Sequence, residues 1–391
     1  MSQPVPFLDL ARQHRLLRAE LDAEFDGLLT RADFIKGAAV GRFEEAFAAY
    51  QQAAHCVAVA NGTDALEIAL RSLELPPGSE VIVPANSFIA TSEAVTMAGL
   101  RPVFADVDDS YNLDPADVEA RITANTSAII AVHLYGQPAD IDALQALAGR
   151  YGLRLIEDAA QAHGAEIGGR RVGALADIGT FSFFPGKNLG AIGDAGAILT
   201  NDADLALACR RLANHGRVGK FDHTSEGRNS RMDTLQAAVL SVKLPHLDDW
   251  LRIRRETART YDQLFAGAGM AAPDDGQPEV AWWSAACAPG QIRGPRSVPG
   301  TLHAYHLYVV RVADRDGVRA ALTESGVASG VHYPTILPRL GAYADHPQHS
   351  EAFACEPWSH EILSLPIGDH MDAACAQRVA EALVAAVGVP G

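Results

Sequence analysis

Residues 128–157 read AIIAVHLYGQPADIDALQALAGRYGLRLIE, and this stretch decides the fold class. Apolar residues run almost without a break from Ala128 to His133 and again from Leu153 to Glu157, while Ile141 to Tyr151 has the apolar spacing of a helix. Strands that are apolar at nearly every position are typical of a parallel sheet covered on both faces. We therefore predict two parallel strands joined by a helix.

The same alternation of short apolar runs and helix-like segments extends from about residue 40 to residue 200. It predicts an α/β fold with a mostly parallel sheet, in which right-handed crossovers bring the carboxyl ends of the strands to one ligand-binding edge. Further strands are expected at Cys56 to Ala60, Glu80 to Pro84, Pro102 to Ala105, Gly179 to Phe184 and Ala197 to Thr200, and further helices at Thr63 to Leu73 and Ile89 to Ala98.

From Leu235 the pattern changes to a long amphipathic stretch through Trp250 to Phe265, which we expect to be broken or bent near Pro245. A Pro/Gly-rich segment, Pro273 to Gly300, follows. We interpret it as an irregular loop or hinge, since proline and glycine interrupt regular structure.

Beyond this segment, His306 to Val312 is expected to form a strand and Arg315 to Ser325 a helix. The chain is therefore predicted to form a large domain over residues 1–245, with the N-terminal segment included, and a smaller C-terminal α+β domain over residues 246–391.

The composition excludes several classes of partner. The 391 residues carry a formal net charge of -16 at pH 7, so we predict neither nucleic acid nor an anionic membrane as a partner. The five cysteines lack the spacing of a metal site, and no apolar run is long enough to span a bilayer. We expect a cytoplasmic protein with reduced thiols and no bound metal.

Residues 61–66, NGTDAL, follow an expected strand and begin an expected helix. Gly62 allows a tight turn, the first amides of the helix are free to donate, and the Thr63 hydroxyl adds a further donor, so the junction can hold a phosphate. The alternative is an ordinary junction in which Asp64 stabilises the first helical turn.

Asp158 ends the apolar run that begins at Leu153. A carboxylate at the carboxyl end of a parallel strand can pair with the protonated ring nitrogen of a pyridine cofactor and keep the ring electron-withdrawing. The alternative is a side chain that caps the following turn.

Only four lysines occur, Lys36, Lys187, Lys220 and Lys243. Lys187 follows an expected strand in the stretch TFSFFPGKNLG, residues 180–190, where glycines and aromatic residues surround it. Burial there would lower the pKa of the amine and favour Schiff-base formation. A solvated charge is the alternative, whereas a Walker phosphate ligand is excluded because the required glycine spacing is absent. We expect the other three lysines at a helix entry, in a polar loop and on the amphipathic helix.

In order and spacing, these three motifs resemble the DegT/DnrJ/EryC1/StrS family of sugar aminotransferases. The resemblance implies the fold-type I architecture of aspartate aminotransferase, with a large domain that binds pyridoxal 5'-phosphate. It extends from Phe7 to Pro334, and further matching stretches are Pro84 to Thr91, His133 to Gln137 and Arg228 to Ala238.

The resemblance implies a role for each matching residue around the cofactor ring. Lys187 matches the lysine that forms the Schiff base and carries protons, and Asp158 matches the carboxylate on the pyridine nitrogen. Gln161 matches a partner of the phenolic oxygen, and Phe88 matches the aromatic residue that stacks on the ring.

The resemblance also implies how the cofactor phosphate is held. Gly62, Thr63 and Ser182 match phosphate ligands. Asn229 matches a residue that reaches the cofactor phosphate of the neighbouring subunit, which implies a homodimer with shared active sites.

The implied reaction moves an amino group from L-glutamate to a nucleotide-linked keto-sugar. Residues 185–190 (PGKNLG) and 193–196 (GDAG) are similar to members that aminate C3 of a dTDP-3-keto-6-deoxyhexose. Amination at C4 of a nucleotide-4-keto sugar, a UDP-linked 3-keto sugar and a keto-inositol remain alternatives.

Three alternative functions are compatible with the same fold. A dehydratase branch has histidine where this chain has Lys187, and an amino-acid branch uses an arginine clamp for two carboxylates. A non-catalytic regulator that binds the cofactor is the remote alternative. The lysine and the sugar-branch motifs favour the sugar aminotransferase.

Two features depart from the family pattern. His332-Tyr333-Pro334 continues with Thr335 rather than with proline, so His332 and Tyr333 are expected either as substrate contacts or as packing residues. The segment from Pro273 to Gly300 is longer than usual, and we interpret it as a surface insertion or as a loop at the substrate entrance.

Overall fold

The computed structural model describes residues 4–270, 286–296 and 298–388. Its helices are α1 (Leu10–Leu16), α2 (Arg18–Arg31), α3 (Ala38–Tyr50), α4 (Gly62–Ser72), α5 (Ala90–Met97), α6 (Pro115–Arg121), α7 (Ile141–Tyr151), α8 (Ala203–Leu212), α9 (Thr234–Lys243), α10 (Leu247–Gly267), α12 (Arg315–Glu324) and α13 (Ala373–Gly388). The strands of the large sheet are β1 (His55–Val59), β2 (Glu80–Pro84), β3 (Arg101–Ala105), β4 (Thr126–Val132), β5 (Arg154–Asp158), β8 (Ile178–Ser182) and β9 (Gly196–Thr200).

The stretch over residues 128–157 folds as predicted, with β4 and β5 paired in parallel and α7 between them. Helix α7 begins where the Asp140 carboxylate accepts a hydrogen bond from Ala143 N at 3.0 Å. It ends at Gly152, whose φ of 69° is a left-handed conformation that glycine adopts without strain. Local sequence thus sets both ends of this helix.

The large sheet has the strand order β1-β9-β8-β5-β4-β2-β3. All neighbouring strands pair in parallel except at β9, which is antiparallel to both β1 and β8. The predicted α/β fold with a mostly parallel sheet is confirmed. The apolar run at β9 predicts a strand but not its direction, because a buried strand has the same pattern in either orientation.

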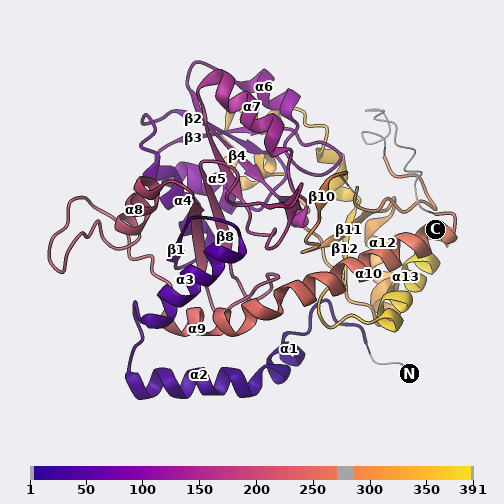
Figure 1. Cartoon of the computed structure of the whole chain (residues 1–391). Coiled ribbons are helices and arrows are strands. Elements are labelled where there is room, and N and C mark those ends of the chain that lie inside the picture. The colour runs from indigo at the N-terminus through magenta and orange to yellow at the C-terminus, as the bar shows by residue number, and fades with distance from the viewer. Residues whose placement is uncertain (1–3, 271–285, 297, 389–391) are drawn as a thin grey trace.

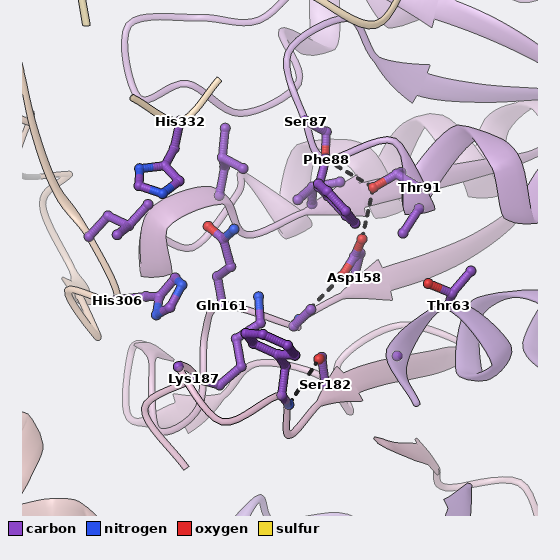
Figure 2. A pocket seen from close by; sticks show the side chains of 18 of the residues that line it. Thr63, Ser87, Phe88, Thr91, Asp158, Gln161, Ser182, Lys187, His306 and His332 are labelled. Atoms are coloured by element: carbon purple, nitrogen blue, oxygen red, sulfur yellow. Dashed lines mark hydrogen bonds between the residues drawn. The ribbon is translucent and has the colours of Figure 1, made fainter. Parts of the chain in front are cut away.

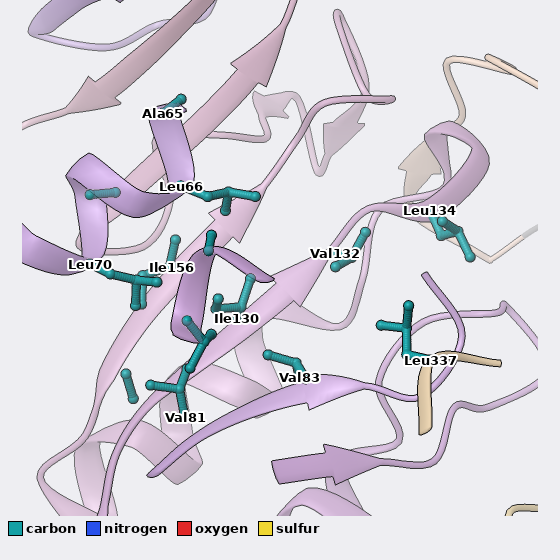
Figure 3. Close-up of a cluster of buried hydrophobic side chains, with 14 of the residues drawn as sticks. Ala65, Leu66, Leu70, Val81, Val83, Ile130, Val132, Leu134, Ile156 and Leu337 are labelled. Atoms are coloured by element: carbon teal, nitrogen blue, oxygen red, sulfur yellow. The ribbon is translucent and has the colours of Figure 1, made fainter. Parts of the chain in front are cut away.

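Helices cover both faces of this sheet (Figure 1). Ile130 and Ile156 pack with α4 and α5 on one face, whereas Ile129 and Leu155 pack with α7 on the other. Figure 3 shows the first of these layers, in which Leu66 and Leu70 of α4 lie over the strands. Successive residues of a strand point to opposite faces, so an unbroken apolar run supplies both layers.

The remaining part of the chain builds a smaller sheet. Strands β11 (Tyr308–Arg311) and β12 (Ile362–Leu365) pair antiparallel, and α12 and α13 pack beside them. Short strands β6 (Glu166–Ile167), β7 (Arg170–Arg171) and β10 (Thr301–Leu302) form a third sheet.

The amphipathic stretch breaks at Pro245 as expected. Helix α9 ends at Lys243, a 3-10 turn spans Leu244–His246, and α10 follows. Leu251 of α10 packs in the core under the large sheet, whereas Tyr261 packs in the core around β11 and β12. The two parts of the chain thus share one helix, and the division at residue 245 stays a prediction.

Helices α1, α2, α3, α6, α8 and α13 were not predicted, although α6 and α8 carry clear local signals. Asp114 caps α6 and Pro115 opens it, while Asp202 caps α8 by accepting from two backbone amides. Much of the segment from Pro273 to Gly300 lies outside the described residues. No helix in the described ranges is long and apolar enough to cross a membrane.

Candidate active site

A cavity of about 580 Å³ opens at the carboxyl ends of the parallel strands (Figure 2). Its lining includes Val132 at the end of β4, Asp158 at the end of β5 and Ser182 at the end of β8. The loop after β2 adds Ser87 and Phe88. This is the sheet edge at which open α/β sheets bind ligands.

The amino end of α4 forms one wall of the cavity. The Asn61 side chain accepts from Asp64 N at 2.8 Å, and its carbonyl accepts from Ala65 N at 3.1 Å. Within the described residues, the amides of Gly62 and Thr63 have no hydrogen-bond acceptor. Two donors at the positive end of a helix suit an anion.

Close packing leaves no room for a side chain at position 62. A Cβ at this position would lie 2.7 Å from the Ser182 Cβ, so a larger residue would push β8 away from α4. The close approach brings the Ser182 side chain and the α4 amides to the same end of the cavity. The predicted phosphate ligands are thus adjacent, although their contact with a phosphate stays a prediction.

Asp158 lies at the end of β5 with 6% of its surface exposed. Burial raises the pKa of its carboxyl group, against hydrogen bonds from Ala160 N and the Thr91 hydroxyl and the positive charge of Lys187. The Thr91 hydroxyl donates to Asp158 Oδ2 at 2.9 Å, and the Ser87 hydroxyl lies 2.9 Å from the Thr91 hydroxyl. This series of hydrogen bonds fixes the Asp158 carboxylate so that it faces the cavity (Figure 2).

Lys187 lies in the loop that follows β8, where its backbone amide donates to Phe184 O at 2.8 Å. Its side chain extends into the cavity (Figure 2). Burial lowers the pKa of its amine to about 8, although the carboxylate of Asp158 acts in the opposite direction. Lys187 as a whole is half-buried, and with this lowered pKa a larger share of its amine is neutral near pH 7 than for a solvated lysine.

Lys243 is fully buried, and burial also lowers the pKa of its amine to about 8. Its Nζ donates to Gly190 O at 2.7 Å and lies 3.0 Å from His14 Nε2, outside the cavity lining. Lys36 and Lys220 are exposed. Lys187 is therefore the one lysine that can react with a molecule in the cavity.

Polar and aromatic side chains complete the opposite wall. Gln161 accepts from Tyr135 N at 2.7 Å and donates to the Tyr333 hydroxyl at 3.2 Å. The rings of Phe88 and Tyr333 lie 5.7 Å apart, and Phe88 remains 52% exposed. His332 lies 2.8 Å from the Ser364 hydroxyl and stacks on Phe7.

The structure brings most of the predicted site residues together. Those that line the cavity are Lys187, Asp158, Gly62, Thr63, Phe88, Gln161, Ser182, His332 and Tyr333. Asn229 lies elsewhere, exposed and bridged to Asn214. The described part of the segment from Pro273 to Gly300 does not line the cavity either.

The sequence analysis missed Thr91, His306, Phe7 and Leu8 as lining residues. Thr91 carried a signal, since a threonine in the first turn of the helix after β2 lies at the same sheet edge as Asp158. Phe7 and Leu8 come from the N-terminal segment and His306 from the segment just before β11, and no local pattern places them at this edge.

Comparison with known proteins agrees with this geometry. The model of the DegT/DnrJ/EryC1/StrS aminotransferase family matches residues 16–384. The dTDP-3-amino-3,4,6-trideoxy-alpha-D-glucose transaminase of Streptomyces venezuelae is 42% identical over 97% of this chain and 95% of its own. The erythromycin biosynthesis sensory transduction protein EryC1 of Saccharopolyspora erythraea is 44% identical over 97% of this chain and 99% of its own.

A solved structure is equally similar. DesV of S. venezuelae, in complex with a ketimine intermediate, superposes with a TM-score of 0.91 at 41% identity and covers 100% of both chains. With the family match over residues 16–384 and a lysine facing a carboxylate at the strand ends, this chain belongs to the DegT/DnrJ/EryC1/StrS aminotransferase family.

Proposed function

We propose that this protein uses pyridoxal 5'-phosphate to move an amino group from L-glutamate to C3 of a dTDP-3-keto-6-deoxyhexose. The observation that carries the proposal is that Lys187 lines the same cavity as the buried carboxylate of Asp158, in surroundings that lower the pKa of its amine. Schiff-base chemistry needs such an amine, and a pyridine cofactor needs such a carboxylate.

The residues that line the cavity suit the cofactor in their chemistry. The free amides of Gly62 and Thr63 and the Ser182 hydroxyl would hold its phosphate. Asp158, held by Thr91, would pair with its ring nitrogen, and Phe88 would cover its ring. When bound, this cofactor supplies an electron sink that lets a proton leave the carbon beside the nitrogen.

The residues of the chain would then transfer protons and orient the ligand. With its pKa lowered to about 8, Lys187 can take up and return a proton near neutral pH. Gln161 and Tyr333 are hydrogen-bonded to each other, so they present fixed polar groups to the ligand. These fixed groups lower the cost of ordering the site when a ligand binds.

The substrate class follows from the flanks of Lys187 and from the relatives. Residues 185–190 and 193–196 resemble members that act at C3, and the S. venezuelae relative is named for a 3-amino sugar. His332 and Tyr333 at the far wall are candidate sugar contacts. A C4 aminotransferase or one acting on a UDP-linked 3-keto sugar is the alternative.

A regulatory role is the second candidate, because EryC1 is named a sensory transduction protein. Lys187 and Asp158 favour catalysis, since a sensor of the cofactor needs no lysine with a lowered pKa that faces the ligand. The proposed enzyme works as a homodimer in the cytoplasm, with Asn229 of each chain reaching the neighbouring cofactor phosphate. The exposure of Asn229 and its place outside the cavity of its own chain support this arrangement.

Incubation of the amine-loaded enzyme with a panel of sugars tests the substrate. We expect a dTDP-3-keto-6-deoxyhexose to restore the aldehyde absorbance and to gain an amino group by mass, at least about tenfold faster than 4-keto or UDP-linked sugars. Faster reaction with a 4-keto sugar would contradict the C3 assignment. If no sugar gives a product, the aminotransferase assignment is wrong and the regulatory role is favoured.

Borohydride reduction of the loaded protein tests the role of Lys187. The reduced cofactor should stay bound to the peptide that contains Lys187, because this is the one lysine that lines the cavity. Lys243 is the internal control, since its pKa is also lowered to about 8 but its Nζ is hydrogen-bonded elsewhere. Cofactor mass on the Lys243 peptide would refute the assignment.

Two substitutions test the carboxylate. Asp158→Asn should lower kcat by at least about 100-fold while the protein still binds cofactor, because a neutral amide does not hold the ring nitrogen protonated. Thr91→Val removes the hydroxyl that donates to Asp158 and should lower kcat about tenfold. Thr91→Ser keeps the hydroxyl and serves as the control. A full rate in Asp158→Asn would argue against the pairing.

Mixing two inactive variants tests the shared site. Lys187→Ala chains and Asn229→Ala chains should each be impaired, and their mixture should regain up to about one quarter of the wild-type rate, because a hybrid dimer holds one intact site. Equal mixing of either variant with itself is the control. If the mixture gains no activity although mass measurement finds hybrid dimers, Asn229 does not act across an interface.

A further inference from the structure

Lys243 is a buried cation that the function proposed above does not use. It is the last residue of α9, its surface is fully buried, and it lies outside the cavity lining. Its Nζ donates to Gly190 O at 2.7 Å and lies 3.0 Å from His14 Nε2. Gly190 belongs to the loop that carries Lys187, and His14 belongs to α1. One amine thus joins three segments that are distant in the sequence.

Lys243 is the donor in both contacts. Burial lowers the pKa of its amine to about 8, so near pH 7 the amine is mostly protonated and has no lone pair to offer. Burial and the charge of Lys243 lower the pKa of His14, so the ring of His14 is neutral there and its Nε2 can accept. The charge of Asp369 acts on both side chains, and Asp369 Oδ1 accepts from Gln13 of α1 at 3.3 Å.

The loop of residues 183–191 closes on itself at Gly190. Lys187 N donates to Phe184 O at 2.8 Å, which folds the first half of the loop into a turn. A Cβ at Gly190 would lie 2.3 Å from Pro185 O, so the two halves of the loop touch there. A displacement of Gly190 would therefore move Pro185 and, with it, the backbone that carries Lys187.

The N-terminal segment forms the wall of the cavity beside this loop. Phe7 and Leu8 line the cavity just before α1 begins. Leu8 Cδ1 lies 3.6 Å from the place that a Cβ of Gly186 would take, and Phe7 stacks on His332 with ring centroids 5.8 Å apart. His14 lies in the last turn of the same helix. A bond that holds His14 therefore also holds the apolar wall next to the Lys187 loop.

We propose that Lys243 is a positioning residue for Lys187: by donating to Gly190 O and to His14 Nε2, it locks the Lys187 loop to the N-terminal wall of the cavity. The packing of Leu8 beside Gly186 brings the two segments together, but apolar contacts have no preferred direction. The two hydrogen bonds supply that direction and set the distance between loop and wall.

The cost of burying this amine argues for a role beyond packing. In the described part of the chain, the hydrogen bonds of Lys243 Nζ go to neutral acceptors, so no carboxylate at short range offsets the loss of water around its charge. An apolar side chain of the same length could fill the space without that cost, but it could not join the two segments. The inference rests on the proposed function, because the place of the Lys187 amine matters for a reaction only if that amine reacts.

Hydrogen exchange of the cofactor-free protein tests this lock without turnover. Lys243→Met keeps most of the side-chain volume and removes the donor. The peptide that contains residues 183–191 should exchange at least about fivefold faster in this variant, because the loop loses an anchor, while the peptide of β4 keeps its wild-type rate. Equal acceleration of both peptides would show a general loss of stability and would overturn the specific role.

Substitutions of His14 test the same link from α1, where the side chain is only half-buried. His14→Leu removes the acceptor and should also speed exchange in residues 183–191, although it alters another segment. His14→Gln can place an oxygen near the former Nε2 and should restore most of the wild-type rate. Arg15→Leu, an exposed change on the same helix, is the control and should leave this peptide unchanged.

Combining the two changes tests whether they act through one link. The double variant His14→Leu/Lys243→Met should exchange residues 183–191 no faster than Lys243→Met alone, because each substitution breaks the same connection. Additive acceleration would contradict a shared link. If Lys243→Met does not fold, the comparison of His14→Leu, His14→Gln and Arg15→Leu decides the proposal by itself.

Kinetics of the loaded enzyme tests the consequence for Lys187. Lys243→Met should lower kcat about tenfold with KM for the sugar changed less than about twofold, because a misplaced amine slows proton transfer and leaves the sugar contacts in place. His14→Gln should keep most of the wild-type kcat. An unchanged kcat beside faster exchange would refute the positioning role.

The exchange measurements also separate this inference from the function on which it rests. Unchanged exchange of residues 183–191 in both Lys243→Met and His14→Leu would overturn the lock even if the wild type aminates a sugar. The same is true if His14→Gln exchanges as fast as His14→Leu. A wild type that aminates no sugar, in a protein whose variants show the expected exchange, would refute the function and keep the lock.

Discussion

The site depends on placing one amine, that of Lys187, where burial lowers its pKa and no hydrogen-bond partner holds it charged. Within the described residues, no group accepts a hydrogen bond from Lys187 Nζ, and burial outweighs the attraction of Asp158. The loop after β8 sustains this arrangement, because Lys187 N bonds to Phe184 O and Ala191 N bonds to Phe183 O. The free energy for this burial comes from packing elsewhere in the fold, as is usual for functional sites.

Two other buried cations show the difference between a structural charge and a reactive one. Lys243 donates to Gly190 O, and Arg254 donates to the carbonyls of Tyr305, His306 and Ile367. Lys243 Nζ and Arg254 Nη1 donate to carbonyl oxygens that would otherwise need donors, so burial of these charges is tolerated. Both support the site: Lys243 holds the end of the Lys187 loop, and Arg254 holds the segment of His306.

Sequence reasoning succeeded where the determinants are local. The bounds of α7 follow from Asp140 and Gly152, and the strand-end position of Asp158 follows from the apolar run before it. It failed where a contact joins distant segments: Thr91 and Asp158 are 67 residues apart, and Asn188 and His306 are 118 apart.

The acidic surface and the anionic ligands implied by the proposed function can coexist because the two kinds of charge act over different distances. At physiological salt the net charge of -16 is screened beyond about 8 Å, so it slows the approach of an anion more than it weakens the bound state. Inside the cavity, the α4 amides and the amine of Lys187 lie next to the ligand and are hardly screened. A few fixed donors at the strand ends therefore outweigh a much larger charge spread over the surface. The net charge of the chain bears on which large charged partners approach its surface, but it does not predict the chemistry of its cavity.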